Sequence, residues 1–293
     1  MADLSYDGIE VGAEYGPWTY PLAARIARHL EAVENGHPWH RERSPWGPPV
    51  APPLVMGNAT LRFIDSIAPV PPGTLHAKQE LEIERALRLD RRLLAYGRFA
   101  DKYERRGRKW FVFEARFRDD SGLIIGRSRV TMAFPGPAAP ALPQEEGSRK
   151  QEEESARKGE LKAVVRTLTA ERLVAYSEDS ANALRGTSIH TDAEVAQAKG
   201  FAAPVAQGLM SADYISELML AVFGQGWLLG GRLALAFVRP VLAGDTLTAN
   251  GRRSARLDEG SFSRETYEVW CENQRGEAVT LGTASGLLPS PAE

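Results

Sequence analysis

Cys271 is the only cysteine among the 293 residues, so no disulfide can form within the chain, and a metal site built from cysteines is excluded. No hydrophobic run is long enough to span a bilayer, and the N-terminal residues lack the basic and then apolar pattern of a signal peptide. A strong charge of either sign is also absent. The formal net charge of −2 argues against nucleic-acid and anionic-membrane partners. We therefore expect a cytoplasmic protein with no metal site.

The length of the chain favours two compact units rather than one. Hydrophobic residues make up 43% of the sequence and charged residues 25%, as in ordinary globular domains. Residues 135–159 are dense in proline, alanine and charge and offer almost nothing to a core. We predict an N-terminal half at residues 1–134, a linker at 135–159 and a C-terminal half at 160–293.

The two halves repeat a series of features in the same order. The series is a histidine, a Pro-Val-Ala segment and a glycine turn: His40, Pro49 and Gly73 in the first half, and His190, Pro204 and Gly244 in the second. The interval between the proline and the glycine is much shorter in the first half. Because a helix is expected in this interval, the comparison predicts that the helix of the first half is truncated.

Residues 208–223 carry apolar residues at helical spacing, and Gly224 is placed to end the helix. Its wide apolar surface predicts a buried central helix. Strand-like segments surround it in each half: residues 15–20, 75–87, 93–103, 110–118 and 123–134 in the first, and 161–168, 232–238, 246–256, 263–271 and 278–287 in the second. No helical segment separates the late strands, so we predict an α+β fold with antiparallel sheets wrapped around central helices.

The stretch Ser188-Ile189-His190-Thr191-Asp192, followed by Gly-Phe-Ala-Ala-Pro-Val-Ala-Gln-Gly-Leu-Met at residues 200–210, carries a recognisable motif. It resembles the hydratase motif of MaoC-like dehydratases and (R)-specific enoyl-CoA hydratases, and the resemblance extends over about residues 161–287. It implies a tandem hot-dog fold and reversible hydration of a 2-enoyl thioester to a 3-hydroxyacyl thioester. In related double hot-dog proteins, a reduced N-terminal helix resembles an adaptation to long or bulky acyl groups.

Hydration needs a base for the water, an acid for the α-carbon and donors for the thioester oxygen. The resemblance implies that His190 is the base, although a histidine in such a loop can also serve only to bind a carbonyl group. Gly208 opens the central helix, where unpaired N–H groups can receive an oxyanion. Its alternative role is that of a simple turn residue. Ser188, Leu209 and Asn182 are the other expected substrate-binding residues.

The acid is where the sequence departs from the family pattern, because Arg185 occupies the position of the usual aspartate. A Ser-Glu-Asp run ending at Asp179 lies further upstream, and Asn182 follows it. Two interpretations stay open: an inserted loop keeps Asp179 and Asn182 in their roles, or the acid is missing. Asp192 is a substitute acid, although that position more often caps the next helix in the family.

The first half departs further from the pattern, since Asn35 stands where the acid would be. We expect this half to be non-catalytic. Two alternatives to a hydratase remain: an acyl-CoA thioesterase, against which the lack of a carboxylate before Asp213 on the central helix argues, and a non-catalytic acyl-thioester-binding protein. The expected substrate is carried by coenzyme A or by acyl carrier protein, and coenzyme A enters only as part of it, with no further cofactor. Monomer and homodimer both stay open.

Overall fold

The structure is a computed structural model that describes residues 3–136, 161–179 and 187–289. Its strands are β1 (Glu14–Tyr20), β2 (Leu75–Ile83), β3 (Leu93–Arg105), β4 (Arg108–Asp119), β5 (Ile124–Ala133), β6 (Val164–Thr167), β7 (Arg232–Phe237), β8 (Thr246–Glu259), β9 (Phe262–Glu272) and β10 (Ala278–Pro289). Its helices are α1 (Leu22–Ala32), α2 (Val55–Ile67), α4 (Ala170–Asp179), α5 (Ala193–Ala198), α6 (Gly208–Phe223) and α7 (Gln225–Gly230), with a short 3-10 helix at Pro38–His40.

The strands form one 10-stranded sheet in the order β1-β3-β4-β5-β2-β7-β10-β9-β8-β6. Neighbouring strands are antiparallel throughout. Read from its outer edge, the first half has the order β1-β3-β4-β5-β2 and the second half has the equivalent order β6-β8-β9-β10-β7. The halves meet where β2 pairs with β7, from Lys78 opposite Ala236 to Glu82 opposite Arg232. The predicted α+β class with antiparallel strands is confirmed.

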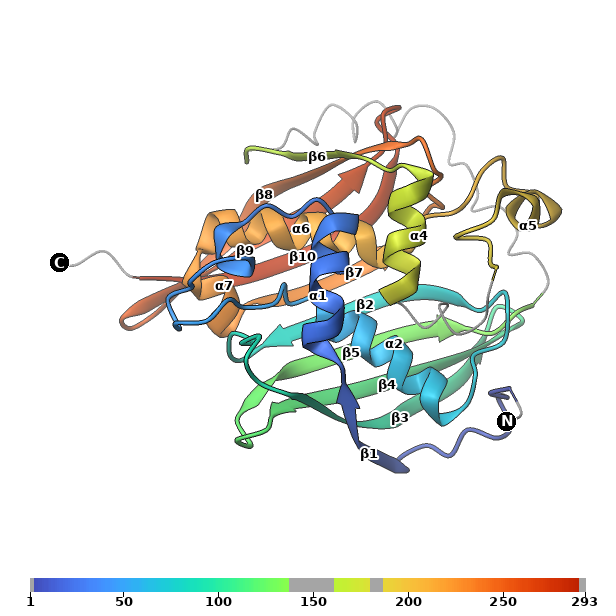
Figure 1. The fold of residues 1–293 in the computed structure, drawn as a ribbon, viewed down its shortest axis with the longest axis horizontal. Coiled ribbons are helices and arrows are strands. Elements are labelled where there is room, and N and C mark those ends of the chain that lie inside the picture. Colours follow the sequence, from blue (N-terminus) through green and yellow to red (C-terminus); the bar gives the residue numbers. More distant parts are fainter. Residues whose placement is uncertain (1–2, 137–160, 180–186, 290–293) are drawn as a thin grey trace.

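Each half places one central helix against the sheet, α2 in the first half and α6 in the second (Figure 1). The helix predicted at residues 208–223 coincides with α6, which is buried along most of its length. Gly224 ends it with a φ of 53°, a conformation that glycine adopts at little cost. Helices α1 and α4 pack together and cover the central helices on the side away from the sheet (Figure 1).

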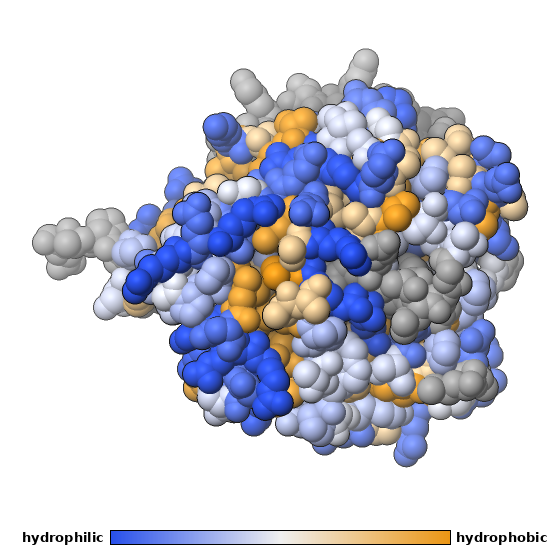
Figure 2. Space-filling model, viewed as in Figure 1, coloured by the Kyte–Doolittle hydropathy of each residue, from blue (hydrophilic) through white to orange (hydrophobic). Residues whose placement is uncertain are grey.

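The hydrophobic core lies between the sheet and the central helices. Its largest fully buried side chains are Trp227, Tyr20, Tyr176, Tyr214, Phe99, Phe111, Phe113 and Phe117. The face seen in Figure 2, which includes α1 and α4, is largely hydrophilic, with hydrophobic residues gathered near its middle. The apolar surface of the central helices is therefore enclosed by the sheet on one side and by α1 and α4 on the other.

The helix of the first half is shorter than its counterpart, as predicted, but by less than the sequence comparison implied. Helix α2 has 13 residues and α6 has 16. The comparison paired Gly73 with Gly244, yet Gly73 precedes β2 whereas Gly244 precedes β8. The strand order makes β2 the counterpart of β7, so the turns at Gly73 and Gly244 are not equivalent. Pairing them is what made the helix of the first half seem strongly shortened.

Candidate functional site

His190 is held by a pair of hydrogen bonds to the segment that leads into α6. The backbone N–H of Val205 donates to the Ile189 carbonyl at 2.8 Å, and Nδ1 of His190 lies 2.6 Å from the Val205 carbonyl oxygen. A carbonyl oxygen only accepts, so Nδ1 carries a proton in this bond. We call this pair of bonds the histidine clamp.

The clamp leaves Nε2 of His190 as the ring atom able to accept a proton. The ring is partly buried, and burial lowers the pKa of His190 below its ordinary value of 6.5 because it disfavours the charged imidazolium. The bond to the Val205 carbonyl raises the pKa again by a smaller amount. At neutral pH the imidazole is therefore uncharged, which is the state that a general base requires.

Three residues after Val205, Gly208 begins α6. The preceding residue, Gln207, does not cap the helix with its side chain and instead donates from Nε2 to Oγ of Ser177 at 2.9 Å. The first N–H groups of a helix lack intrahelical partners and lie at the positive end of its dipole. The start of α6 can thus stabilise negative charge.

Packing explains why position 208 is a glycine, which the sequence did not reveal. A Cβ atom placed on this residue would lie 2.9 Å from the ring of Phe237 in β7, closer than real Cβ contacts come. The space left by the missing side chain is therefore already occupied by Phe237. Glycine is required here by the sheet that packs on the helix.

The candidate acid, Asp179, is the last residue of α4. Its side chain, together with Asn182 and Arg185, lies outside the described part of the structure. Ser177, two residues earlier, is buried and bonded to Gln207, so the end of α4 and the start of α6 are adjacent. Asp179 is therefore at the end of α4 that is hydrogen-bonded to Gln207, and Gln207 belongs to the same segment as the Val205 of the histidine clamp.

The other expected residues have local structural roles. Ser188 accepts a hydrogen bond on Oγ from the His190 backbone N–H at 3.2 Å and thus shapes the histidine loop. Asp192 caps α5, accepting from the N–H groups of Glu194 at 2.8 Å and Val195 at 3.1 Å, as its family position suggests. Leu209 is fully buried against Gly57 of α2.

The first half contains a second histidine clamp. Nδ1 of His40 lies 2.8 Å from the Val50 carbonyl oxygen, and the Val50 N–H donates to the Trp39 carbonyl at 2.9 Å. Burial lowers the pKa of His40 to about 4, with a smaller opposing contribution from the bond to Val50. The two halves therefore hold their histidines in the same way, with the ring neutral at pH 7.

Sequence reasoning missed a cluster of four buried polar residues where α1, α2, α4 and α6 meet. The four are His29, Asn58, Tyr176 and Asp213. Each helix contributes one residue, so no local motif connects them. The only available signals were an aspartate within the apolar α6 and a histidine on the buried side of α1.

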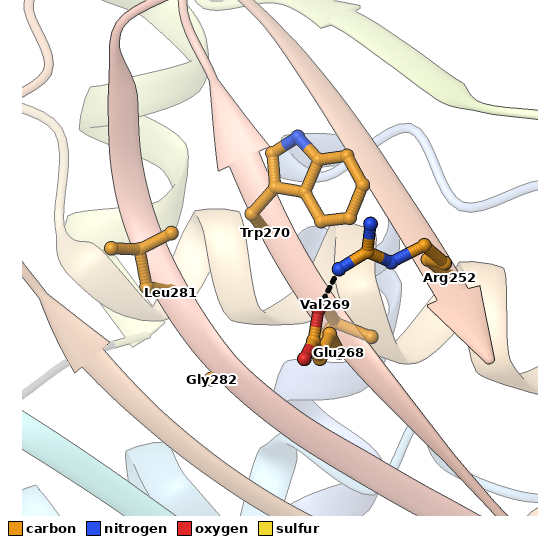
Figure 3. A pocket seen from close by; sticks show the side chains of 6 residues that line it. All are labelled: Arg252, Glu268, Val269, Trp270, Leu281 and Gly282. Carbon is orange, nitrogen blue, oxygen red and sulfur yellow. Dashed lines mark hydrogen bonds and ion pairs between the residues drawn. The ribbon is translucent and has the colours of Figure 1, made fainter. Parts of the chain in front are cut away.

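A hollow of about 180 Å³ on the second half is lined by Arg252, Glu268, Val269, Trp270, Leu281 and Gly282 (Figure 3). Tyr267 of β9 contacts Phe223 of α6, so its neighbours Glu268 and Trp270 alternate with the residues that face the helix. Arg252 and Glu268 form an ion pair at 2.6 Å across the hollow's floor. This hollow is on the opposite face of the sheet from α6.

Among the described residues, no group of three or more His, Cys, Asp and Glu side chains is arranged to hold a metal ion. Within the same part of the chain, no helix is both long and apolar enough to cross a membrane.

The strand order and the paired central helices define a tandem hot-dog protein, and comparisons agree. A solved structure described as a MaoC-like dehydratase matches with a TM-score of 0.74 and 16% identity over 97% of this chain and 99% of that one. A MaoC-like dehydratase from Phytophthora capsici matches with a TM-score of 0.70 and 17% identity over 98% and 99%. A Mycobacterium tuberculosis protein described as having a double hotdog fold matches with a TM-score of 0.63 and 12% identity over 98% of each chain.

At these low identities, the TM-scores show a common fold. The family model of the MaoC like domain matches residues 159–269, which contain the histidine clamp and α6. Residues 159–269 thus match a MaoC-like domain within a double hot-dog fold, and the resemblance expected from the sequence is confirmed. No match was found among curated proteins.

Proposed function

We propose that the chain is a hydro-lyase acting on an acyl thioester, which reversibly hydrates a 2-enoyl-CoA to a 3-hydroxyacyl-CoA. The observation that carries this proposal is the position of His190. The clamp binds Nδ1, leaves Nε2 as the basic atom, and fixes the ring to the segment that opens α6 three residues later. A base and an oxyanion-stabilising helix start are thereby supplied by one short stretch within the MaoC-like domain.

In the proposed reaction, Nε2 of His190 takes a proton from water while the water oxygen forms a bond to the β-carbon of the substrate. The electrons of the carbon–carbon double bond move toward the thioester carbonyl, whose oxygen gains negative charge. The N–H groups at the start of α6, including that of Gly208, stabilise this charge. A proton delivered to the α-carbon completes the addition. Dehydration is the same sequence reversed, and coenzyme A takes part only as a portion of the substrate.

The proposal assigns proton delivery to Asp179, with Asn182 as a neighbouring substrate-binding residue. Support comes from the bond between Ser177 and Gln207, which ties the last turn of α4 to the segment between the histidine clamp and Gly208. A loop inserted after Asp179 leaves the end of α4 in this position. This favours the interpretation that the acid is retained rather than missing.

The first half is proposed to be non-catalytic for a reason visible at the start of its central helix. Residue Val50 in the His40 clamp corresponds to Val205 in the His190 clamp. Pro53 is three residues after Val50, and Gly208 is three residues after Val205, so the two residues occupy matching positions. Proline has no backbone N–H, so the first half lacks this donor, and Asn35 replaces the acid.

The thioesterase alternative requires a free carboxylate on or near the central helix. Asp213 is such a carboxylate by position, but it is 2% exposed and both of its oxygens are hydrogen-bonded, one to His29 and one to Tyr176. It is therefore engaged within the protein. This observation favours hydration over hydrolysis.

The test is an assay of crotonyl-CoA that follows both the loss of the conjugated double bond and the release of free thiol. We expect double-bond loss without thiol release in the wild-type protein. His190→Ala should lower kcat/KM by at least roughly 100-fold, in the range for a general base, and Asp179→Asn by a similar factor. His40→Ala is the matched control, because it removes the equivalent clamped histidine, and it should change kcat/KM less than about threefold.

Thiol release without hydration would establish the thioesterase alternative, and neither activity would favour a non-catalytic binding protein. A large loss in His40→Ala with full activity in His190→Ala would place the chemistry in the first half. Unchanged activity in Asp179→Asn would remove this residue from the mechanism while leaving the role of His190 intact.

A further inference from the structure

The four-residue cluster between the halves forms a nearly closed hydrogen-bond ring. Nε2 of His29 lies 3.2 Å from one oxygen of Asp213, and the Tyr176 hydroxyl donates to the other at 2.9 Å. The Asn58 amide nitrogen lies 3.4 Å from Nδ1 of His29 and 3.2 Å from the Tyr176 oxygen. None of the four side chains is more than 2% exposed. We call this set the polar cluster.

One proton arrangement satisfies the donors of the ring. His29 donates from Nε2 to Asp213 and accepts on Nδ1 from Asn58, while Tyr176 accepts from Asn58 and donates to Asp213. Oδ1 of Asn58 is a buried atom of the polar cluster for which the structure shows no hydrogen-bond partner. This ring is a fixed part of the interior, since displacing a member breaks hydrogen bonds between buried groups.

The polar cluster lies further along α6 from the proposed thioester site. Asp213 follows Gly208 by five residues on α6, a distance of about 7.5 Å along the helix axis. On α4, Tyr176 is the neighbour of Ser177, which bonds to Gln207 at the start of α6. Between the helix start and the cluster, Leu209 already packs on Gly57 of α2. The interior along this part of α6 is thus filled by contacts between the two central helices.

A long hydrocarbon tail cannot enter this region without penalty. Its methylene groups offer no hydrogen bond to His29, Asn58 or Asp213, so the tail would leave buried polar groups unpaired. The only slightly shortened α2 adds to this obstacle, because its buried residues occupy the space that a missing helix would leave open.

We infer that the proposed site accepts short-chain acyl thioesters, of roughly four to six carbons for the depth of about 7.5 Å before the cluster, and that the polar cluster sets this limit. This inference rests on the proposed function and names its substrate class. It reverses the expectation of long or bulky acyl groups that a strongly reduced N-terminal helix would imply.

The experiment measures kcat/KM for trans-2-enoyl-CoA substrates from four to twelve carbons with the full chain. Binding of saturated acyl-CoA esters of the same lengths, which cannot be hydrated, is measured in parallel by calorimetry. We expect kcat/KM to fall at least tenfold between six and ten carbons, and butyryl-CoA to bind at least tenfold more tightly than decanoyl-CoA.

The two measurements separate this inference from the proposed function. Hydration that is equal or faster with ten carbons overturns the inference and leaves the hydratase assignment standing. Absence of hydration with preferential binding of butyryl-CoA refutes the hydratase assignment and supports the short-chain site. Equal binding of all lengths, or no binding of any, overturns the inference.

A variant tests whether the polar cluster sets the limit. His29→Ala combined with Asp213→Ala removes the imidazole and the carboxylate and opens space, and it should raise the ten-carbon to four-carbon ratio of kcat/KM at least tenfold. The matched control is Ser216→Ala, a buried residue of α6 whose hydroxyl accepts from the Trp227 indole at 3.0 Å outside the cluster. An unchanged ratio in a folded double variant overturns the role of the cluster. Should the double variant fail to fold, the wild-type chain-length series still decides the inference.

Discussion

The neutral, buried His40 makes the stability of the protein depend on pH. Burial lowers the pKa of this histidine from 6.5 to about 4 in the folded chain, whereas the unfolded chain exposes it to water. The unfolded state therefore binds a proton more readily between these two pH values. The stability associated with the neutral ring is complete above about pH 6.5 and is lost as the pH falls toward 4.

The size of this effect follows from the shift. Each pKa unit corresponds to about 1.4 kcal/mol, so lowering the pKa from 6.5 to about 4 amounts to roughly 3 kcal/mol at full protonation. Replacing the ring by a group that does not titrate should remove this part of the pH dependence. The His40→Leu substitution does so, although it also costs stability at every pH, since the Val50 carbonyl loses its partner.

The assay is urea unfolding of the wild-type protein and of His40→Leu at several pH values between 7.5 and 4.5. We expect the difference in unfolding free energy between the two proteins to shrink as the pH falls, by roughly 2.5 kcal/mol over this range. Other titrating groups are common to both proteins and cancel in the difference. A difference that stays constant with pH would refute the claim that the native chain holds His40 neutral through its burial.

Two further predictions follow from the site. Because burial lowers the pKa of His190, the acid limb of the kcat/KM profile for crotonyl-CoA should fall below pH 6.5, and a limb at or above that value would exclude His190 as the titrating base. Gly208→Ala should destabilise the protein by about 1–3 kcal/mol, because its Cβ would lie 2.9 Å from the Phe237 ring. Thermal unfolding measures this loss, and adding Phe237→Leu should recover part of it; no recovery would contradict the packing explanation.

The spacing of apolar residues predicted the helices and strands of this fold well, because burying one face of an element imposes that spacing on the sequence. The spacing of the apolar residues from Gly208 to Phe223 indicates the buried helix α6, and the glycine that follows indicates its end. The late strands alternate buried and exposed residues between glycine turns, which is again a local pattern.

The features that sequence reasoning missed depend on contacts between distant segments. His29 and Asp213 are 184 positions apart and meet only because α1 covers α6. The need for glycine at position 208 arises from Phe237 on another strand. The length of α2 was misjudged because two similar glycine turns belong to different strand connections, and only the sheet order shows which of them correspond.

The two histidine clamps show that a histidine in this position has a structural role, so its presence alone is not evidence of catalysis. His40 and His190 make the same bonds to a valine in the segment before the central helix. The second half has an N–H at Gly208, whereas Pro53 at the matching position of the first half has none. The clamp itself therefore has a structural role, which is to fix the loop before the helix, and that role explains why both halves contain this histidine. Catalysis by His190 therefore rests on the other groups of the proposal, which are the donors at the start of α6 and the carboxylate assigned to Asp179. On this argument the clamp of the first half contributes to stability, while Pro53 leaves that half without the donor.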